Sequence, residues 1–441
     1  MKKFFSLFLM ISVFGFGQEL DENALFQEDT LITEAPLLTN TSSKGISLTG
    51  NIQSLFTYSF ERDKLTNKDS QATNLFSYGI GGDIFVDIRQ EKGYKAFVDI
   101  GFLATSGGVP LLRTYVDPLT ATSLPLIETN SFLVQIKEAF VDFPLFHLLY
   151  FRFGKQYLTW GTTYFWNPTD LLNRERKSLS SLNTPREGIW GIKLHIPYQT
   201  LFNWYTFLDT TETKDLSTSA LASRLELLLG NTEIGLCGWW KKHFISVYGA
   251  DLSTRLWGWD IKAEGSLSYG DNRPVLKEEM IPYGPLTITN YTTEKITNKW
   301  VYRIAVNFSR SWELWDVKER LSTMVEVFYN SEGKNDSLFE NPTKTQMALL
   351  SGAYVPNEYG KWYGLLSIGF RKLFVSEVSS QIYILWNIED RSAVLSSTLF
   401  YNPVDEVQSS LGLVWYTGKD KQEYTSTDFP VVLTAQFSLK F

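Results

Sequence analysis

Charged side chains stand at every second position within several otherwise apolar runs of this chain. Over residues 257–269, Asp260, Lys262 and Glu264 share one face, while the residues between them are mainly aromatic or aliphatic. Over residues 300–308 the same alternation places Arg303 opposite an apolar face. Such charges are tolerated only where they are hydrated or paired, so their expected chemistry is contact with water, ions and polar solutes.

Residues suited to metal binding or nucleophilic catalysis are few. The chain has one cysteine, Cys237, and three histidines, His147, His195 and His243. A single cysteine excludes an internal disulfide, and the set is too small to favour a Cys/His metal cluster. We therefore expect no metal and no cofactor, and we expect Cys237 to be a small buried apolar residue.

The first residues have the pattern of a secretory signal. Lys2 and Lys3 precede an apolar stretch over residues 4–17, which is too short to cross a bilayer as an ordinary helix. The pattern predicts a signal peptide over residues 1–17, cleaved before Gln18, and a flexible periplasmic segment over residues 18–44. Beyond it no window approaches 18 apolar residues, which argues against a helical membrane protein.

Residues 45–441 repeat one unit, an alternating run followed by turn residues. We count about 18 such runs, with 16 as the alternative, and their connections alternate between short and long. The tight turns include residues 230–231 and 254–255, whereas residues 105–130, 159–186 and 270–297 form long connections. This pattern predicts an all-β fold, a single transmembrane antiparallel up-and-down β-barrel with short periplasmic turns and long outer loops.

The last strand carries apolar residues at alternate positions up to its end. Phe437, Leu439 and Phe441 share one face, with Ser438 and Lys440 on the other. This ending resembles the final strand of Gram-negative outer-membrane β-barrels. The resemblance implies that periplasmic chaperones and the barrel assembly machinery deliver the chain to outer-membrane lipid, with these three residues as the assembly signal.

A second resemblance covers residues 151–170, which read FRFGKQYLTWGTTYFWNPTD. The succession of Gly-Lys-Gln, Trp-Gly and Asn-Pro-x-Asp resembles porin-type families, including relatives of alginate and carbohydrate porins. Because Asn-Pro-x-Asp restricts the backbone to a turn, the loop over residues 159–186 is a candidate to fold inward as a constriction. Its Arg174, Arg176 and Lys177 would then border a pore; the alternative is a solvated charge run on an outer loop.

The residues that face away from the apolar stripes describe the expected lumen. The candidates for pore lining or constriction are Arg152, Gln156, Asp170, Arg174, Arg176, Lys177, Lys193, Asp260, Lys262, Glu264 and Arg303. Charges of both signs predict a hydrated lumen with weak ion selectivity. Glu138 is an exception, since its position assigns it to the lipid face, and this requires either a β-bulge or another register.

Three classes of function compete for such a barrel. A porin-like channel for the diffusion of small hydrophilic solutes fits the charged lumen best, and a transporter for hydrophobic compounds such as fatty acids is the alternative. An outer-membrane enzyme is disfavoured, because only His243 is expected near the outer rim. The formal net charge of -7 argues against a nucleic-acid partner. The oligomeric state and the transported solute stay open.

Overall fold

The computed structural model describes residues 45–62, 65, 74–90, 93–107, 131–146, 148–172, 188–198, 201–211, 213, 215–283, 286–335, 338–427 and 429–441. The expected signal peptide and the segment over residues 18–44 lie outside these described residues, as do His147, Arg174, Arg176 and Lys177.

Twenty strands are present in the described chain, and eighteen of them form one sheet. The eighteen are β1 (Gly45–Phe60), β2 (Leu75–Arg89), β3 (Lys95–Gly107), β4 (Ser131–Leu145), β5 (Leu149–Gln156), β6 (Ile189–Tyr198), β7 (Phe202–Asp209), β8 (Ala220–Leu229), β9 (Thr232–Lys241), β10 (Val247–Leu256), β11 (Trp259–Tyr269), β14 (Trp300–Leu314), β15 (Val317–Asn330), β16 (Trp362–Phe370), β17 (Val378–Asn387), β18 (Ser392–Val404), β19 (Val407–Thr417) and β20 (Val431–Lys440).

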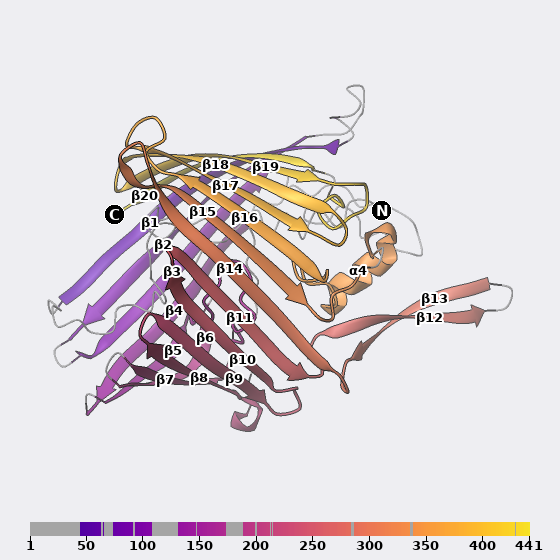
Figure 1. Cartoon of the computed structure of the whole chain (residues 1–441), viewed down its shortest axis with the longest axis horizontal. Coiled ribbons are helices and arrows are strands. Elements are labelled where there is room, and N and C mark those ends of the chain that lie inside the picture. The colour runs from indigo at the N-terminus through magenta and orange to yellow at the C-terminus, as the bar shows by residue number, and fades with distance from the viewer. Residues whose placement is uncertain are drawn as a thin grey trace.

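The sheet closes on itself to form a barrel (Figure 1). Each strand pairs antiparallel with its neighbours along the chain, and β1 pairs with both β2 and β20. The terminal Phe441 completes the seam, because its backbone exchanges two hydrogen bonds of 2.9 Å with Gly50. The predicted antiparallel up-and-down barrel of 18 strands is therefore confirmed, and the alternative of 16 strands is wrong.

The two faces of the barrel wall differ as the alternation predicts. On β14, Tyr302, Ile304 and Phe308 are 40–44% exposed on the outer face. Between them, Ala305 and Asn307 are buried on the inner face. A closed sheet satisfies every strand's backbone groups internally, and an apolar outer belt suits hydrocarbon. This is the architecture of a protein that crosses the outer membrane as a barrel.

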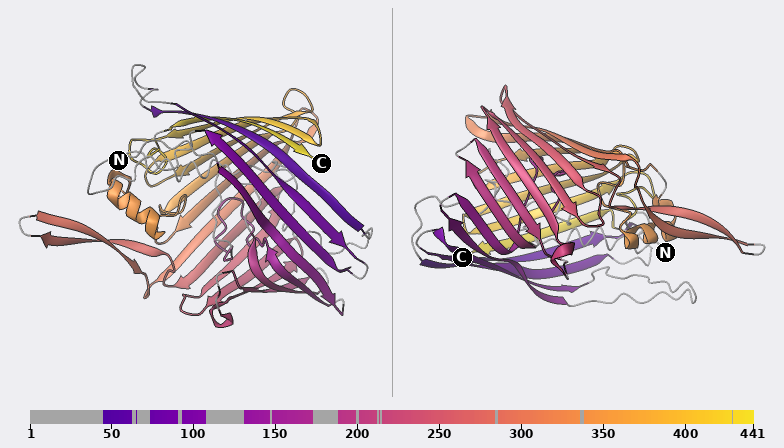
Figure 2. Two further views of the ribbon diagram at one scale, coloured as in Figure 1. Left: turned by 180° about the vertical axis from the view of Figure 1, so that it is seen from behind. Right: turned by 90° about the horizontal axis from the view of Figure 1, so that it is seen from below.

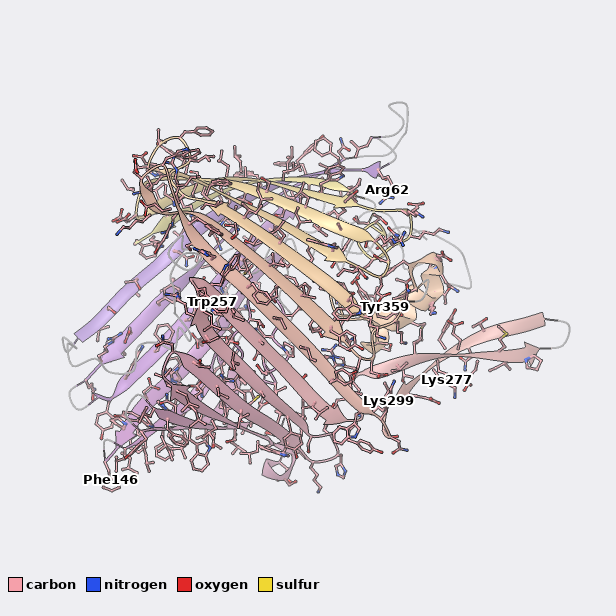
Figure 3. The ribbon with its side chains drawn as sticks, in the orientation of Figure 1. Arg62, Phe146, Trp257, Lys277, Lys299 and Tyr359 are labelled. Atoms are coloured by element: carbon pink, nitrogen blue, oxygen red, sulfur yellow. The ribbon has the colours of Figure 1, made fainter. Side chains whose placement is uncertain are left out.

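The two rims of the barrel also differ. Short turns join the strands at one rim, where the labelled Phe146 and Trp257 lie, and β20 ends at the same rim (Figure 3). Longer connections lie at the opposite rim, near Arg62, Lys299 and Tyr359 (Figure 3). Because bacterial barrels place short turns in the periplasm, we assign the long-loop rim to the cell exterior.

The long connection over residues 270–297 is more ordered than a plain loop, which corrects the sequence interpretation. Its residues form the hairpin of β12 (Pro274–Tyr283) and β13 (Leu286–Lys295), which projects away from the barrel (Figures 1 and 2). The helix α4 (Pro342–Ser351) packs near the base of the hairpin, and Lys344 Nζ lies 2.8 Å from Glu278 Oε1. Within the described part of the chain, no helix is long and apolar enough to span a membrane.

A β-bulge in β4 resolves the position of Glu138. The register with β3 shifts so that Asp99 pairs with Glu138 and the next residue, Ile100, pairs with Ile136. The extra residue turns Glu138 to the inner face, where its Oε1 accepts the backbone N–H of Tyr157 at 2.7 Å. A carboxylate that would have faced lipid thus binds the chain just after β5.

Candidate functional site

Residues 157–172, which follow β5, run inside the barrel, and we call them the inner segment. Hydrogen bonds join them to inward-facing side chains of β11, β15 and β17. Within β5, Gly154 has a φ of 125°, which is open to glycine and strained for other residues, and the strand ends two residues later at Gln156. Beyond Gln156 the chain leaves the sheet and continues as the inner segment.

Glu264 on β11 binds the middle of the inner segment. Its Oε1 accepts the backbone N–H of Thr163 at 2.9 Å and Asn167 Nδ2 at 3.0 Å, while its Oε2 accepts the backbone N–H of Thr169 at 3.1 Å. The hydroxyl groups of Thr163 and Thr169 also donate to it. Glu264 is only 3% exposed, so these donors replace the water that a carboxylate would otherwise require.

The two motifs of the inner segment have separate structural roles at this carboxylate. Gly161 of the Trp-Gly pair has a φ of 103°, and a Cβ there would stand 2.5 Å from Glu264 Oε2. Residues 167–170 form a β-turn with Pro168 at its second position, closed by the Asp170 N–H to the Asn167 carbonyl at 3.0 Å. Gly161 therefore allows the backbone to approach the Glu264 carboxylate closely, and Pro168 fixes the turn that follows.

Glu326 on β15 binds the segment at a second point. Its carboxylate accepts the consecutive backbone N–H groups of Tyr164, Phe165 and Trp166 at 2.8–2.9 Å. Asn307 Nδ2 on the neighbouring strand β14 donates to the same carboxylate at 2.8 Å. Three successive N–H groups that converge on one carboxylate form an anion-binding nest. Residues 164–166, which we call the tip of the inner segment, are therefore held at the wall formed by β14 and β15.

Aromatic packing fills the barrel around that tip. The Trp166 ring stacks on Phe328 of β15 at 5.4 Å between centroids, and the Tyr164 hydroxyl lies 2.8 Å from that of Tyr383 on β17. The wall residues Phe328, Tyr363, Leu365, Tyr383 and Leu385 are all buried on the inner face. This apolar part of the inner face differs from the charged lumen that the alternation predicts, although both faces of residues 378–387 carry large apolar residues.

A second apolar cluster holds the beginning and end of the inner segment. Leu158, Trp160 and Leu172 pack with Phe207, Ala222 and Cys237, which come from β7, β8 and β9. Cys237 is buried, as predicted, and its thiol lies 3.7 Å from the Thr169 carbonyl. The inner segment is thus in contact with two separated parts of the wall.

Charged residues on the strands β2–β10 form ion pairs, most of them between different strands. Arg152 on β5 binds both carboxylate oxygens of Asp142 on β4, at 2.6 and 2.9 Å. Arg224 on β8 binds Asp251 on β10 and Glu226 on its own strand. The further pairs are Lys95 with Asp87 and Lys137 with Asp83. Alternating signs on one surface oppose a strong preference for either ion charge.

The remaining candidates occupy different places. Gln156, Asp170 and Lys193 are buried inside the barrel. Asp260 lies at the short-turn rim, where it binds Arg255 at 2.6 Å, and Lys262 is half-buried between it and Glu264. Arg303 binds Asp271 at the long-loop rim. The sequence indicates Glu264 as a lining residue, but it does not indicate the role of Glu326 or of the threonines at 163 and 169, since no pattern in the sequence joins residues so far apart.

His195, which the sequence offered as a residue for metal binding or catalysis, packs and hydrogen-bonds within the barrel. His195 stacks on Tyr205 at 4.3 Å between centroids, and its Nε2 lies 3.0 Å from Asn203 Oδ1. Among the described residues, no group of three or more His, Cys, Asp or Glu side chains is arranged to hold a metal ion. The proposed assembly residues Phe437, Leu439 and Phe441 are exposed on the outer face.

Comparisons with known proteins agree on the fold alone. No protein-family model matches the sequence, and no curated protein matches it. Solved structures similar to the chain include OccAB1 of Acinetobacter baumannii (TM-score 0.50, 10% identity, covering 90% of this chain and 96% of that one). OccK5 and OccK9 of Pseudomonas aeruginosa also have TM-scores of 0.50, at 6% and 9% identity, with 90% of this chain and 97% of each covered.

Proposed function

We propose that this chain is an outer-membrane channel through which small hydrophilic solutes diffuse, and that the inner segment sets the narrowest part of the path. The observation that carries the proposal is the attachment of a 16-residue segment inside the barrel by Glu264 and Glu326. A segment held at two places on the wall reduces the free cross-section of a lumen and fixes which side chains border it.

The paired charges of the inner face support a hydrophilic path. Ion pairs such as Arg152–Asp142 and Arg224–Asp251 are costly inside hydrocarbon but stable beside water and polar partners. The apolar inner residues on β15–β17 do not favour the alternative of a hydrophobic transporter, because Phe165 and Trp166 of the inner segment already cover them. The inner face therefore fits small polar solutes better than fatty acids.

The site residues have proposed roles in this channel. Five of them would line the path or support its wall: Arg152, Gln156, Lys193, Lys262 and Arg303. Two others, Asp170 and Glu264, would shape the constriction. Asp260 would lie at its periplasmic mouth. Arg174, Arg176 and Lys177 would border the constriction from the continuation of the inner segment. The exposed aromatic residues of β20 fit recognition by the barrel assembly machinery, with outer-membrane lipid as the final surroundings.

Liposome swelling tests the proposal. Purified barrel is reconstituted into liposomes, which are diluted into isotonic arabinose, glucose, sucrose or raffinose. We expect swelling faster than in protein-free liposomes, with rates that fall as the sugar becomes larger. A Trp257→Ser variant, changed at an exposed turn, should swell at the wild-type rate. Background swelling in all four sugars, from protein shown to be folded by its heat-modifiable mobility, would reject a diffusion channel.

A further inference from the structure

We propose that the outer loops over residues 354–358 and 422–424 form a latch, joined at Asn357, that holds the inner segment in place from the cell exterior. This inference rests on the proposed function, since it concerns the segment that we assign to the constriction. It adds a positioning role to residues that lie outside the barrel wall.

Asn357 connects the two parts of this arrangement. Its carbonyl accepts Trp166 Nε1–H of the inner segment at 2.8 Å. Its side-chain Oδ1 accepts the Tyr424 hydroxyl at 2.8 Å, and its backbone N–H donates to Glu423 Oε1 at 3.1 Å. The backbone of Asn357 is left-handed, with a φ of 62°, a conformation that asparagine adopts more readily than most residues. One residue thus joins the inner segment to the loop between β19 and β20.

Glu423 is the centre of the latch on the loop side. Its Oε1 also accepts the Tyr354 hydroxyl at 3.1 Å, and its Oε2 accepts the Tyr363 hydroxyl at 2.7 Å and Asn387 Nδ2 at 2.8 Å. These donors come from the loop before β16, from β16 itself and from the end of β17. Glu423 is only 1% exposed, so its carboxylate joins the loop before β16 to the start of β16 and the end of β17 around one buried group.

The surroundings of Glu423 make the latch sensitive to protonation. The titratable groups around it are Tyr354, Tyr363, Tyr424 and Asp390, whose Oδ2 accepts the Glu423 backbone N–H at 2.7 Å. Burial raises the pKa of Glu423 to about 7, and the negative charge of Asp390 acts in the same direction. The latch is therefore less stable when Glu423 is ionised than when it is protonated. Glu423 ionises as the pH rises through about 7.

The consequence for the inner segment follows from the shared hydrogen bond. When the loops around Glu423 open, Asn357 moves with them, and Trp166 loses the acceptor of its indole N–H. A buried indole N–H without a partner is unfavourable, so opening of the loops weakens the hold on the tip even though Glu326 still binds it. The exterior loops and the inner segment then open as coupled elements.

Amide hydrogen exchange in the full-length barrel tests the coupling without relying on conduction. Exchange of the backbone amides of residues 164–166 is followed at pH 5 and pH 8, corrected for intrinsic rates. In the wild type we expect about tenfold faster corrected exchange at pH 8. Glu423→Gln, which cannot ionise, should keep equal corrected rates at both pH values. Trp166→Phe, which retains a ring but not the donor, should abolish the pH response at residues 164–166 and retain it at residues 354–358.

Two results would overturn the latch. The first is that corrected amide exchange at residues 164–166 of the wild type is the same at pH 5 and pH 8. The second is that the pH dependence of this exchange persists in Glu423→Gln. Tyr424→Phe offers a milder variant, which should speed exchange at residues 164–166 by removing one hydroxyl from Asn357; unchanged exchange there would also count against the latch. A barrel that shows the exchange response but passes no sugar would refute the channel and retain the latch.

Discussion

Glu264 and Thr163 lie 101 residues apart in the sequence, yet the carboxylate of the first accepts the backbone N–H of the second at 2.9 Å inside the barrel. A charged acceptor that binds several buried donors contributes more than a neutral one. We expect Glu264→Gln to increase corrected amide exchange at Thr163 and Thr169 by about tenfold to a hundredfold, equivalent to roughly 1.4–2.8 kcal/mol.

The matched control for this change is Asp260→Asn on the same strand. Asp260 pairs with a partly exposed arginine at the short-turn rim and is remote from the inner segment. Exchange at Thr163 and Thr169 should stay at the wild-type rate in Asp260→Asn. Equal rates in Glu264→Gln and the wild type would show that the carboxylate does not hold the segment.

Gly161 provides a backbone test of the same contact. We expect Gly161→Ala to loosen the inner segment, because alanine is strained at a φ of 103° and its Cβ would meet the Glu264 carboxylate. Single-channel recordings should then show noisier current than the wild type. Gly230→Ala is the control, since its φ is also positive but a Cβ there meets no neighbour. Equal noise in the two variants would leave Gly161 without a special role.

How far the sequence predicts this structure depends on the distance between interacting residues. Alternation is a local property, so it correctly predicted strands, their lipid-facing side and the inward direction of Glu264 and Arg303. The Trp-Gly and Asn-Pro-x-Asp motifs indicated residues 159–186 as a candidate to fold inward, with a solvated outer loop as the alternative, and the described part of that range lies inside the barrel. Alternation did not predict that Glu326 binds three consecutive N–H groups or that Trp166 stacks on Phe328, because closure of the barrel brings these residues together.

Other parts of the structure depend on packing that alternation does not report. Residues 274–295 form a hairpin outside the barrel, where strand-like alternation was not recognised within a polar stretch. The inner faces of β15–β17 carry large apolar residues that pack against the inner segment, so the simple rule of lipid outside and water inside fails there. The exact position of the bulge at Glu138 follows only from the register between β3 and β4, which one strand's sequence does not contain.

The terminal aromatic residue gives a prediction about assembly. We expect deletion of Phe441, or Phe441→Ser, to lower the amount of barrel in the outer membrane several-fold, because the last residue completes the seam with Gly50 and ends the apolar face of β20. Quantification of heat-modifiable barrel in outer-membrane fractions measures this. Phe146→Ser, at an exposed turn residue, should assemble normally; wild-type amounts of the Phe441 variants would contradict an assembly role.

The raised pKa of Glu423 predicts how stability depends on pH. A carboxyl group whose folded-state pKa, about 7, exceeds its ordinary value of 4.5 binds its proton more tightly in the folded protein. Its stabilising effect is therefore present below pH 4.5 and is lost as pH rises to 7. Between these limits the wild type should lose up to about 3 kcal/mol in the free energy of opening of the loops.

Urea unfolding in detergent, followed at pH 4.5 and pH 8, measures this dependence. The difference between the two pH values should shrink in Glu423→Gln relative to the wild type. Glu340→Gln changes an exposed glutamate of the same rim and should keep the wild-type difference. Identical pH dependence in all three proteins would show that Glu423 does not titrate in this range.

The basic cluster after the inner segment predicts a bias toward anions. If Arg174, Arg176 and Lys177 border the constriction, replacing all three by Gln should lower anion preference, most clearly at low salt, since screening acts within about 8 Å at physiological ionic strength. Reversal potential under a salt gradient measures the change. An unchanged reversal potential and conductance at low salt would place the cluster on an external loop.

Single-channel recording in planar bilayers tests whether the barrel conducts and whether the inner segment narrows its lumen. We expect discrete conductance steps from the wild-type barrel, and larger, less regular steps when Glu264→Gln and Glu326→Gln release the inner segment together. Folded, inserted wild-type protein that gives no steps would contradict the assignment as a channel, and a double variant that conducts like the wild type would contradict the inner segment as its constriction.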